Sequence, residues 1–323
     1  MNIVVTGGAG FIGSNLVDRL IEEGHKVVVI DNLSRGEINN VHSRAKFYHQ
    51  DICSTKIRYI FRKEKIDIVY HGAAQIDVQK SIKDPMFDCD VNILGTVNVL
   101  EACKEANVEK IIYSSSAAVY GKPKYLGIDE NHPINPISFY GISKYIPEYY
   151  LRVYNALYNL DYTILRYANV YGIRQKPNSE GGVIAIFLNK LLKNESPIIF
   201  GDGDATRDFI FVEDVVEANI KALHNGSKEV FNIGTGKATL IKELFFLMKD
   251  IIKTDVEVRC SKERKGDTKH SFFDITKAKE KLNWMPKYEL REGLKMTIEY
   301  YKRLLTAQAM DEVAATRENE SDK

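Results

Sequence analysis

Apolar and polar positions follow two different rhythms along the first half of the chain. Short, nearly continuous apolar runs rich in β-branched residues predict strands at 2–6, 26–31, 46–50, 67–73 and 110–116. The longer segments between them, such as FIGSNLVDRLIEEG and DVNILGTVNVLEACKEAN, have the periodicity of amphipathic helices. Strands that are apolar throughout and separated by helices predict a parallel sheet buried on both faces. We therefore predict an α/β fold built on a doubly wound parallel sheet.

Composition and charge narrow the class of partner. The chain has 323 residues, of which 44% are hydrophobic and 28% charged, which is usual for a globular protein with more than one lobe. The formal net charge is +1 with both signs interspersed, so no basic stripe indicates a nucleic-acid partner. The expected ligand is a small molecule.

Signals for secretion, membrane insertion and metal binding are not expected. MNIVVTGG already has the pattern of a strand and a turn, and no apolar run approaches the roughly 18 residues that cross a bilayer. The four cysteines and seven histidines lack metal-ligand spacing, and the thiols are expected to be reduced and buried. We predict a cytoplasmic protein without a metal site or a membrane partner.

A glycine-rich loop follows the first predicted strand. In GGAGFIG at 7–13 the glycines recur every three residues, at the start of the first helix. Glycine permits the tight turn and lets the main chain approach a pyrophosphate, which the helix N-terminus stabilises. Asp31 ends the second strand, where a carboxylate would accept hydrogen bonds from an adenosine ribose and repel the 2′-phosphate of NADP. The pattern predicts NAD binding, with Arg35 interpreted as a solvated loop residue.

The regular alternation ends after YTILRYANVYG, where glycine and proline separate shorter elements. We predict an NAD-binding Rossmann-type domain at 1–170, to which segments near 208–235 return. A smaller, interleaved α/β lobe at 171–305 is predicted to bind the substrate. The polar, alanine-rich segment 306–323 is predicted to be a tail, either a frayed helix end or a disordered segment.

Hydroxyl and amine side chains gather where the fifth predicted strand ends. That strand finishes in SSSAAVYG, and ligands of open α/β sheets bind at the carboxyl ends of the strands. Tyr140 and Lys144 follow, four residues apart on one face of a helix, where an ammonium would lower the pKa of the phenol. Such a pair alone is usually a surface feature, but together with Ser116 beside a nicotinamide it predicts chemistry. Pro147 should kink this helix or end its first segment.

Motifs occur in a fixed order from Met1 to about Arg303, namely GGAGFIG, DNLSRG, HGAAQ, VNILGT, SSSAAVYG, YGISK, LRYANVYG, GGVIAIF, FGDGDATRDFIFVEDV, NIGTG and ERKGD. Together they resemble the extended short-chain dehydrogenase/reductase superfamily, and within it the UDP-glucose/UDP-N-acetylglucosamine 4-epimerase branch. The resemblance implies that Tyr140 is the catalytic base, that Lys144 holds the nicotinamide ribose and lowers the pKa of Tyr140, and that Ser116 hydrogen-bonds the sugar hydroxyl.

The same resemblance implies two sets of binding residues. The cofactor set is Gly7, Gly10, Phe11, Ile12, Gly13, Asp31, Asn32, Ser34, Arg35, Asp51, Ile52, Ala73, Ala74, Gln75, Asn92, Tyr140, Lys144 and Tyr167. The nucleotide-sugar set is Ser116, Asn169, Val183, Phe200, Arg207, Arg264, Asp267 and Ser271. Its two arginines suit a diphosphate, because each offers planar, charge-assisted donors.

The implied reaction is the 4-epimerisation of a UDP-hexose by transient oxidation at C4, with NAD held between turnovers. Sister enzymes that eliminate water or carbon dioxide carry acidic residues directly after the catalytic hydroxyl. This chain has Ala117 and Ala118 there, which cannot move a proton. The alternatives are an epimerase of another nucleotide sugar, such as a UDP-uronic acid, and a non-catalytic NAD-binding sensor protein. The retained trio of serine, tyrosine and lysine argues against the sensor.

Two finer expectations concern substrate size and assembly. Ser271 is small where glucose-restricted relatives carry a bulky tyrosine, which predicts room for N-acetylated UDP-hexoses; a loop serine facing solvent is the alternative. In resembling enzymes the helix near 86–106 and the tyrosine-rich helix after Lys144 pack against their copies. This predicts a homodimer, although ordinary core packing explains the tyrosines equally well.

Overall fold

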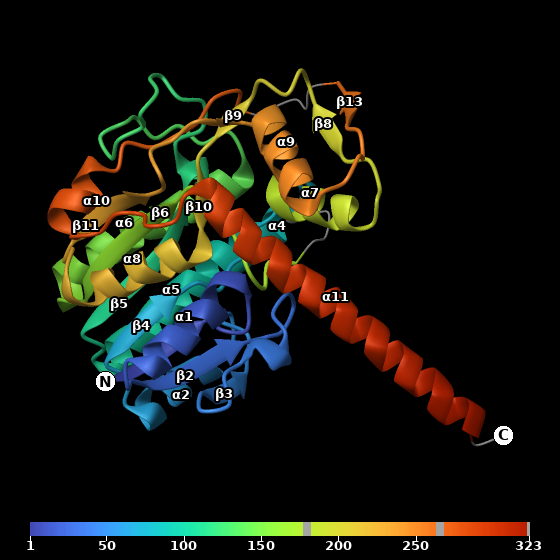
Figure 1. Cartoon of the computed structure of the whole chain (residues 1–323). Coiled ribbons are helices and arrows are strands. Elements are labelled where there is room, and N and C mark those ends of the chain that lie inside the picture. Colours follow the sequence, from blue (N-terminus) through green and yellow to red (C-terminus); the bar gives the residue numbers. More distant parts are fainter. Residues whose placement is uncertain (177–181, 263–267, 322–323) are drawn as a thin grey trace.

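The computed structural model describes residues 1–176, 182–262 and 268–321, and only the backbone of 307–321. In this part of the chain a seven-stranded parallel sheet has the order β11-β6-β5-β4-β1-β2-β3. Its strands are β1 (Asn2–Thr6), β2 (Lys26–Asp31), β3 (Lys46–His49), β4 (Ile68–His71), β5 (Lys110–Ser116), β6 (Asp161–Tyr167) and β11 (Glu229–Ile233). The predicted α/β class with a doubly wound parallel sheet is confirmed (Figure 1).

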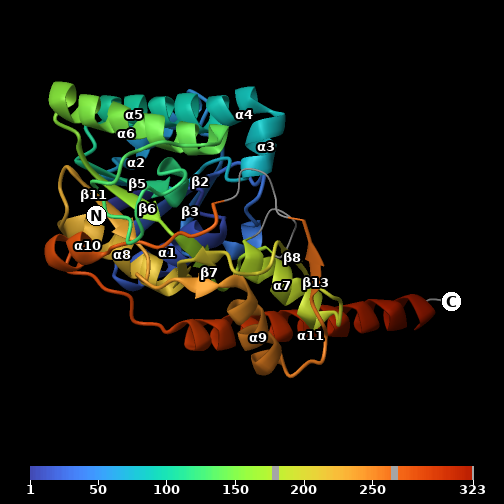
Figure 2. The same cartoon turned by 90° about the horizontal axis from the view of Figure 1, so that it is seen from above.

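Helices cover both faces of the sheet, as Figure 2 shows. One face carries α1 (Phe11–Glu22), α8 (Val212–His224) and α10 (Thr276–Lys281), and the other carries α2 (Lys56–Glu64), α5 (Gly95–Ala106) and α6 (Phe139–Tyr158). Ile3 and Val5 of β1 pack with the first group and Val4 with the second, because successive strand side chains point to opposite faces. The continuously apolar strands therefore form two cores.

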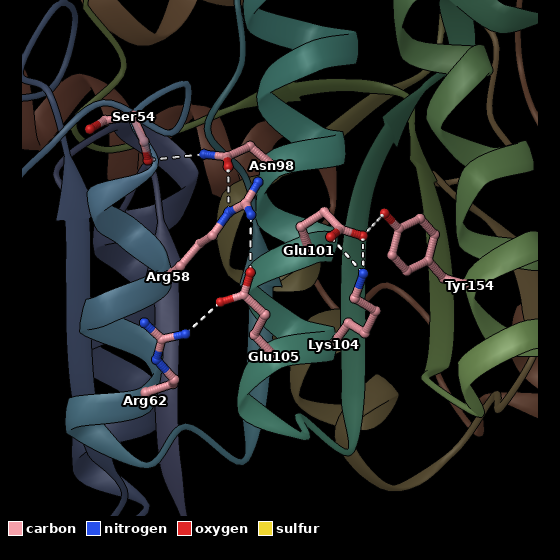
Figure 3. Close-up of polar contacts among 8 residues, drawn as sticks. All are labelled: Ser54, Arg58, Arg62, Asn98, Glu101, Lys104, Glu105 and Tyr154. Atoms are coloured by element: carbon pink, nitrogen blue, oxygen red, sulfur yellow. Dashed lines mark hydrogen bonds and ion pairs between the residues drawn. The ribbon is translucent and has the colours of Figure 1, made fainter.

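Polar side chains tie α2, α5 and α6 into one layer (Figure 3). Arg58 and Arg62 of α2 form ion pairs with Glu105 of α5 at 3.0 and 2.6 Å. The Tyr154 hydroxyl of α6 donates to Glu101 of α5 at 2.6 Å. The three helices are thus joined by polar contacts at their outer side and by the shared core beneath them.

A separate apolar core, which includes Phe187, Leu244 and Leu294, lies outside the central sheet. It is built from α7 (Val183–Leu192), β8 (Ile198–Phe200), α9 (Ile241–Ile252) and α11 (Leu290–Ser321). The short strand pairs here are β7 (Asn169–Tyr171) with β10 (Phe209–Phe211), β9 (Thr206–Arg207) with β12 (Thr239–Leu240), and β8 with β13 (Arg259–Ser261). Figure 1 shows α11 leaving the body of the molecule. The division into domains at residue 170 stays a prediction.

The remaining elements lie in the connections between strands and helices. They are α3 (Val78–Lys83), α4 (Pro85–Cys89), the π-helical turn η2 (Asp90–Leu94), and the 3₁₀ turns η1 (Ile38–Asn40) and η3 (Ala117–Val119). Because α4, η2 and α5 follow one another without a break, they form one helical run with a widened turn in its middle.

The structure corrects two expectations about single residues. Pro147 does not end a helical segment, because α6 continues through it to Tyr158, and the alternative, a kink at Pro147, stays a prediction. Pro147 is buried, so packing holds the helix where one backbone donor is missing. Cys53 and Cys260 are exposed thiols, since they lie outside the two central cores. None of the described helices is long and apolar enough to cross a membrane, and the cytoplasmic location stays a prediction.

Candidate functional site

A cavity of about 300 Å³ opens where the central strands end. Its walls come from the carboxyl ends of β1, β2, β4, β5 and β6 and the loops after them, which meet at one edge because these strands are parallel. The predicted cofactor residues that line it are Gly7, Gly10, Phe11, Ile12, Gly13, Asp31, Asn32, Ser34, Arg35, Asp51, Ile52, Ala73, Ala74, Tyr140, Lys144 and Tyr167. The structure therefore brings the glycine loop and the tyrosine–lysine pair into one cavity.

The loop between β1 and α1 presents bare backbone to this cavity. Gly7 has a φ of +74° and donates its N–H to the carbonyl of Ile30 at 2.9 Å. A Cβ at Gly13 would lie 2.2 Å from the Gly7 carbonyl oxygen, so only glycine fits there. α1 begins at Phe11 without a side-chain cap, which leaves its first N–H groups for an anion. This geometry fits the pyrophosphate of a dinucleotide.

Two carboxylates lie along the adjoining wall. Asp31 is 8% exposed, and its oxygens accept backbone hydrogen bonds from Ala9 at 3.0 Å and Leu33 at 2.8 Å. Asp51 accepts a hydrogen bond from the Asn32 amide at 2.7 Å. Burial opposes ionisation of Asp51, but the hydrogen bonds to its carboxylate outweigh burial and lower its pKa. Both groups are therefore held as oriented acceptors, which suits a ribose and an adenine.

Gln75 and Asn92, two of the predicted cofactor residues, lie behind the cavity wall. Both are buried, and they bind each other through the Gln75 N–H to Asn92 Oδ1 at 2.8 Å and Asn92 Nδ2 to the Gln75 carbonyl at 2.9 Å. Their contacts hold the loop after β4, in which Ala73 and Ala74 face the cavity.

Tyr140 and Lys144 occupy the first turns of α6. The helix is capped by Ser138, whose hydroxyl accepts the Gly141 N–H at 3.1 Å, and this cap sets where the turn begins. Ser116 ends β5 next to the cavity without lining it, and its hydroxyl hydrogen-bonds to Tyr140. The predicted trio is brought together from a strand end and a helix start.

Burial shifts the pKa values of both members of the pair in the protein alone. The hydroxyl of Tyr140 is enclosed, and this burial raises its pKa more than the hydrogen bond from Ser116 lowers it. Burial likewise lowers the pKa of Lys144 to about 8, against the opposing charges of Glu148 and Asp88. The ammonium of Lys144 lies 4.7 Å from the ring centroid of Tyr113. The expected lowering of the Tyr140 pKa by Lys144 together with the positive ring of NAD concerns the cofactor-bound form and stays a prediction.

The described residues of the predicted nucleotide-sugar set do not line the cavity, although Ser116 and Val183 adjoin residues that do. Those outside the lining are Ser116, Asn169, Val183, Phe200, Arg207 and Ser271, whereas Arg264 and Asp267 lie outside the described residues. Arg207 and Ser271 are neighbours, because Arg207 Nη1 and the Ser271 N–H both donate to the carbonyl of Thr206, at 2.8 and 3.2 Å. Val183 follows Gly182, which does line the cavity.

Several lining residues were absent from the prediction. They include Ala9, Asn40, Gln50, Tyr70, Gly72, Ile76, Val91, Arg174, Gln175, Lys176 and Asn219. Ser114 and Ser115, which end β5 beside Ser116, were expected from their position to point toward the crevice of the glycine loop, and they line the cavity. No sequence signal marks Asn219, which comes from α8 and hydrogen-bonds the Tyr167 hydroxyl at 2.9 Å.

Comparison with known proteins identifies the family to which the chain is similar. Residues 3–234 match the model of the NAD dependent epimerase/dehydratase family. The chain is 49% identical over 301 residues to a protein named putative UDP-glucose 4-epimerase of Methanocaldococcus jannaschii, covering 93% of this chain and 98% of that one.

Three solved structures share the whole fold. UDP-glucose 4-epimerase of Thermotoga maritima with UDP-glucose has a TM-score of 0.93 and 48% identity, over 94% of this chain and 100% of that one. UDP-glucose 4-epimerase of Thermus thermophilus with NAD has a TM-score of 0.90 and 37% identity, over 94% and 99%. UDP-N-acetylglucosamine 4-epimerase of Methanobrevibacter ruminantium, with UDP-N-acetylmuramic acid, has a TM-score of 0.90 and 37% identity, over 94% and 98%.

Proposed function

Since the chain belongs to the NAD dependent epimerase/dehydratase family, we propose that it is a UDP-hexose 4-epimerase with Tyr140 as its base. The observation that carries the proposal is that Tyr140 and Lys144 line the same cavity as the glycine loop and the two carboxylates. This arrangement supports a role for Tyr140 as a proton acceptor beside the cradle that fits NAD. The resemblance to the extended short-chain dehydrogenase/reductase superfamily is confirmed by the family match.

In the proposed mechanism the glycine loop holds the pyrophosphate, while Asp31 and Asp51 bind the ribose and adenine. NAD, when bound, supplies the acceptor and donor of the sugar hydride together with a positively charged ring. Tyr140 removes the proton of the sugar 4-hydroxyl and later returns it, and Ser116 orients that hydroxyl. Lys144 donates to the nicotinamide ribose. Because burial raises the pKa of Tyr140 in the protein alone, its activation depends on positive charge arriving with the cofactor.

For the substrate we propose UDP-glucose and UDP-galactose, and also their N-acetylated forms. Arg207 would bind the diphosphate, and the neighbouring Ser271 would leave room for an N-acetyl group.

The direct test is to incubate the purified full-length chain with UDP-galactose and to identify the product by proton NMR. We expect UDP-glucose without added NAD, because the cofactor stays bound between turnovers. Parallel reactions with UDP-N-acetylgalactosamine and with a UDP-uronic acid decide the sugar class. Absence of turnover with every UDP-hexose, in folded protein supplied with NAD, would contradict the proposal.

We also propose that the enzyme is a homodimer that pairs through the outer face of α4 and α6. Apolar side chains are exposed there, with Met86 at 70%, Leu157 at 66% and Tyr149 at 53%. Burying such a face against a copy would remove it from water. We expect Leu157→Arg to convert a dimer into a monomer in light scattering, whereas Tyr59→Arg, at an exposed tyrosine of α2, leaves the dimer intact. A monomeric native chain would contradict this assignment.

A further inference from the structure

A carboxylate lies buried beside the proposed catalytic pair, outside every predicted set of site residues. Asp88 of α4 is 1% exposed and forms no salt bridge with any residue that the structure describes. A buried charge without a partner is costly, and proteins usually pair such a group. The position of Asp88 therefore calls for an explanation in terms of the groups around it.

Two neutral amides donate to this carboxylate. Gln75 Nε2 lies 2.6 Å and Asn92 Nδ2 lies 3.3 Å from Asp88 Oδ1. Asp88 and Asn92 are four residues apart in one helical run, across the widened turn at Asp90–Leu94. Gln75 lies in the loop after β4 that forms part of the cavity wall, and it also hydrogen-bonds Asn92. The bond from Gln75 therefore joins Asp88 of α4 to this loop.

The same amide connects Asp88 to α6. Asn92 Nδ2 lies 2.9 Å from Ser143 Oγ, and Ser143 Oγ in turn donates to the carbonyl of Tyr140 at 3.1 Å. Because Asn92 Nδ2 has two N–H groups for three acceptors, the contact with Asp88 is the weakest of the three, and the path from the carboxylate runs through Gln75 to Asn92 and Ser143. Ser143 precedes Lys144 directly, so this path reaches the turn that carries the pair. The hydroxyl of Ser81 also accepts the Tyr140 N–H, at 3.2 Å, from α3.

Besides Tyr140, the charged and titratable groups around Lys144 come from five elements, α4, α6, β4, β5 and β6. Glu148 lies one turn further along α6, but Arg166 of β6 binds it at 2.6 and 3.0 Å and largely neutralises it. Tyr113 of β5 offers its ring, and His71 of β4 is kept neutral because burial, together with the charge of Lys144, lowers its pKa to about 3. Asp88 is the second carboxylate that acts on Lys144, after Glu148.

We propose that Asp88 is a positioning residue of this enzyme, whose buried charge holds Lys144 as an ammonium and whose hydrogen bonds order the Tyr140–Lys144 turn. This inference rests on the proposed function and deepens it. Asp88 would touch neither the cofactor nor the sugar and would act through Asn92, Ser143 and the electrostatic field.

The test compares Asp88→Asn, which keeps the shape and removes the charge, with Asp90→Asn at an exposed position of the same helical run. The full-length enzyme is assayed with UDP-galactose from pH 6 to 10. In Asp88→Asn the alkaline limb of kcat/KM should move down by about one pH unit, because the ammonium loses its counter-charge. The KM at pH 6.5 and the bound NAD should change less than about twofold. Asp90→Asn should behave as the native enzyme.

A second variant separates the two parts of the role. Ser143→Ala removes the link to the turn and leaves the carboxylate, so kcat should fall roughly threefold at every pH without a shift of the limb. If Asp88→Asn does not fold, this variant carries the test, and native activity in folded Ser143→Ala would overturn the inference.

A readout independent of turnover distinguishes failure of the inference from failure of the proposed function. The pH dependence of Lys144 acetylation by acetic anhydride, followed by peptide mass spectrometry, reports when the ammonium loses its proton. Its midpoint should be lower in Asp88→Asn than in Asp90→Asn. Equal acetylation midpoints in the two variants would overturn the role of Asp88 even if the native protein is an active epimerase. If the midpoints differ as expected but the native protein converts no UDP-hexose, the proposed function alone is contradicted.

Discussion

The residues proposed to bind the cofactor and those proposed to bind the nucleotide sugar lie on differently built parts of the molecule. The cofactor residues follow long parallel strands of one sheet, so the topology alone brings them to one edge. Arg207 lies on a two-residue strand, and Ser271 is held beside it by the Thr206 backbone. The cofactor residues are therefore positioned by the sheet as a whole, whereas the nucleotide-sugar residues are positioned by a few local contacts.

This difference implies that the two halves can be disturbed separately. A variant of Tyr140 or of the sugar-binding residues should leave the NAD cradle intact, because the cradle is built from β1, α1 and β2. Loss of bound NAD in such a variant would instead mean that the halves fold and bind as one unit. Four predictions test this separation.

The largest effect is expected for Tyr140→Phe. Removing the proton acceptor should reduce turnover of UDP-galactose by about 10²–10⁴-fold, while the variant folds and retains NAD. Steady-state kinetics and the absorbance spectrum of the purified protein measure both quantities. An active variant would mean that another group is the base.

A smaller effect is expected for Arg207→Lys, which keeps the charge but loses the planar fork. The KM for UDP-galactose should rise roughly tenfold with kcat little changed, and NAD should stay bound. Arg303→Lys, at a side chain that is 84% exposed on α11, serves as the matched control. An unchanged KM would remove Arg207 from the diphosphate site.

Ser271→Tyr should change specificity more than activity. A bulky ring beside Arg207 should lower kcat/KM for UDP-N-acetylgalactosamine by roughly tenfold relative to UDP-galactose, since it fills the space of the acetyl group. The ratio of the two rates in one preparation is the measurement, and UDP-galactose is its internal control. An equal decrease in kcat/KM for both sugars would show that Ser271 does not lie next to the N-acetyl group.

The smallest effect is expected on thermal stability, and it tests the electrostatic cost of burying Lys144. The pKa of Lys144 in the folded protein, about 8, is below its ordinary value of 10.5, so the unfolded chain binds this proton more tightly. The free energy of unfolding is therefore lowered by the full amount of this cost below about pH 8, and this loss of stability disappears as the pH rises toward 10.5. Lys144→Met should therefore raise the Tm of the cofactor-free protein by roughly a few degrees at pH 7 and less at pH 10.

Calorimetry at the two pH values measures this difference. Lys63→Met, at an exposed lysine of α2, should change the Tm little at either pH. A Tm of Lys144→Met below that of the native protein at pH 7 would show that the ammonium stabilises the fold, which is the opposite of the effect that its lowered pKa implies.

Sequence patterns indicated many of the residues that line the cavity, because these residues stand at positions with a local cause. Gly7 needs a positive φ, Gly13 needs close backbone contact, and Asp31 ends a strand, and each of these requirements is visible in a short segment. Asn219 and Arg174 were missed because they reach the cavity from segments far along the chain that carry no motif.

The order of apolar strands and helices, the glycine loop and the spacing of Tyr140 and Lys144 were determined by the sequence alone. Only the tertiary structure decided that Gln75 and Asn92 stand behind the wall, that α6 continues through Pro147, and that burial raises the pKa of Tyr140. The physical reason is that desolvation and charge depend on distances between residues remote in sequence. Short sequence patterns therefore cannot predict those distances.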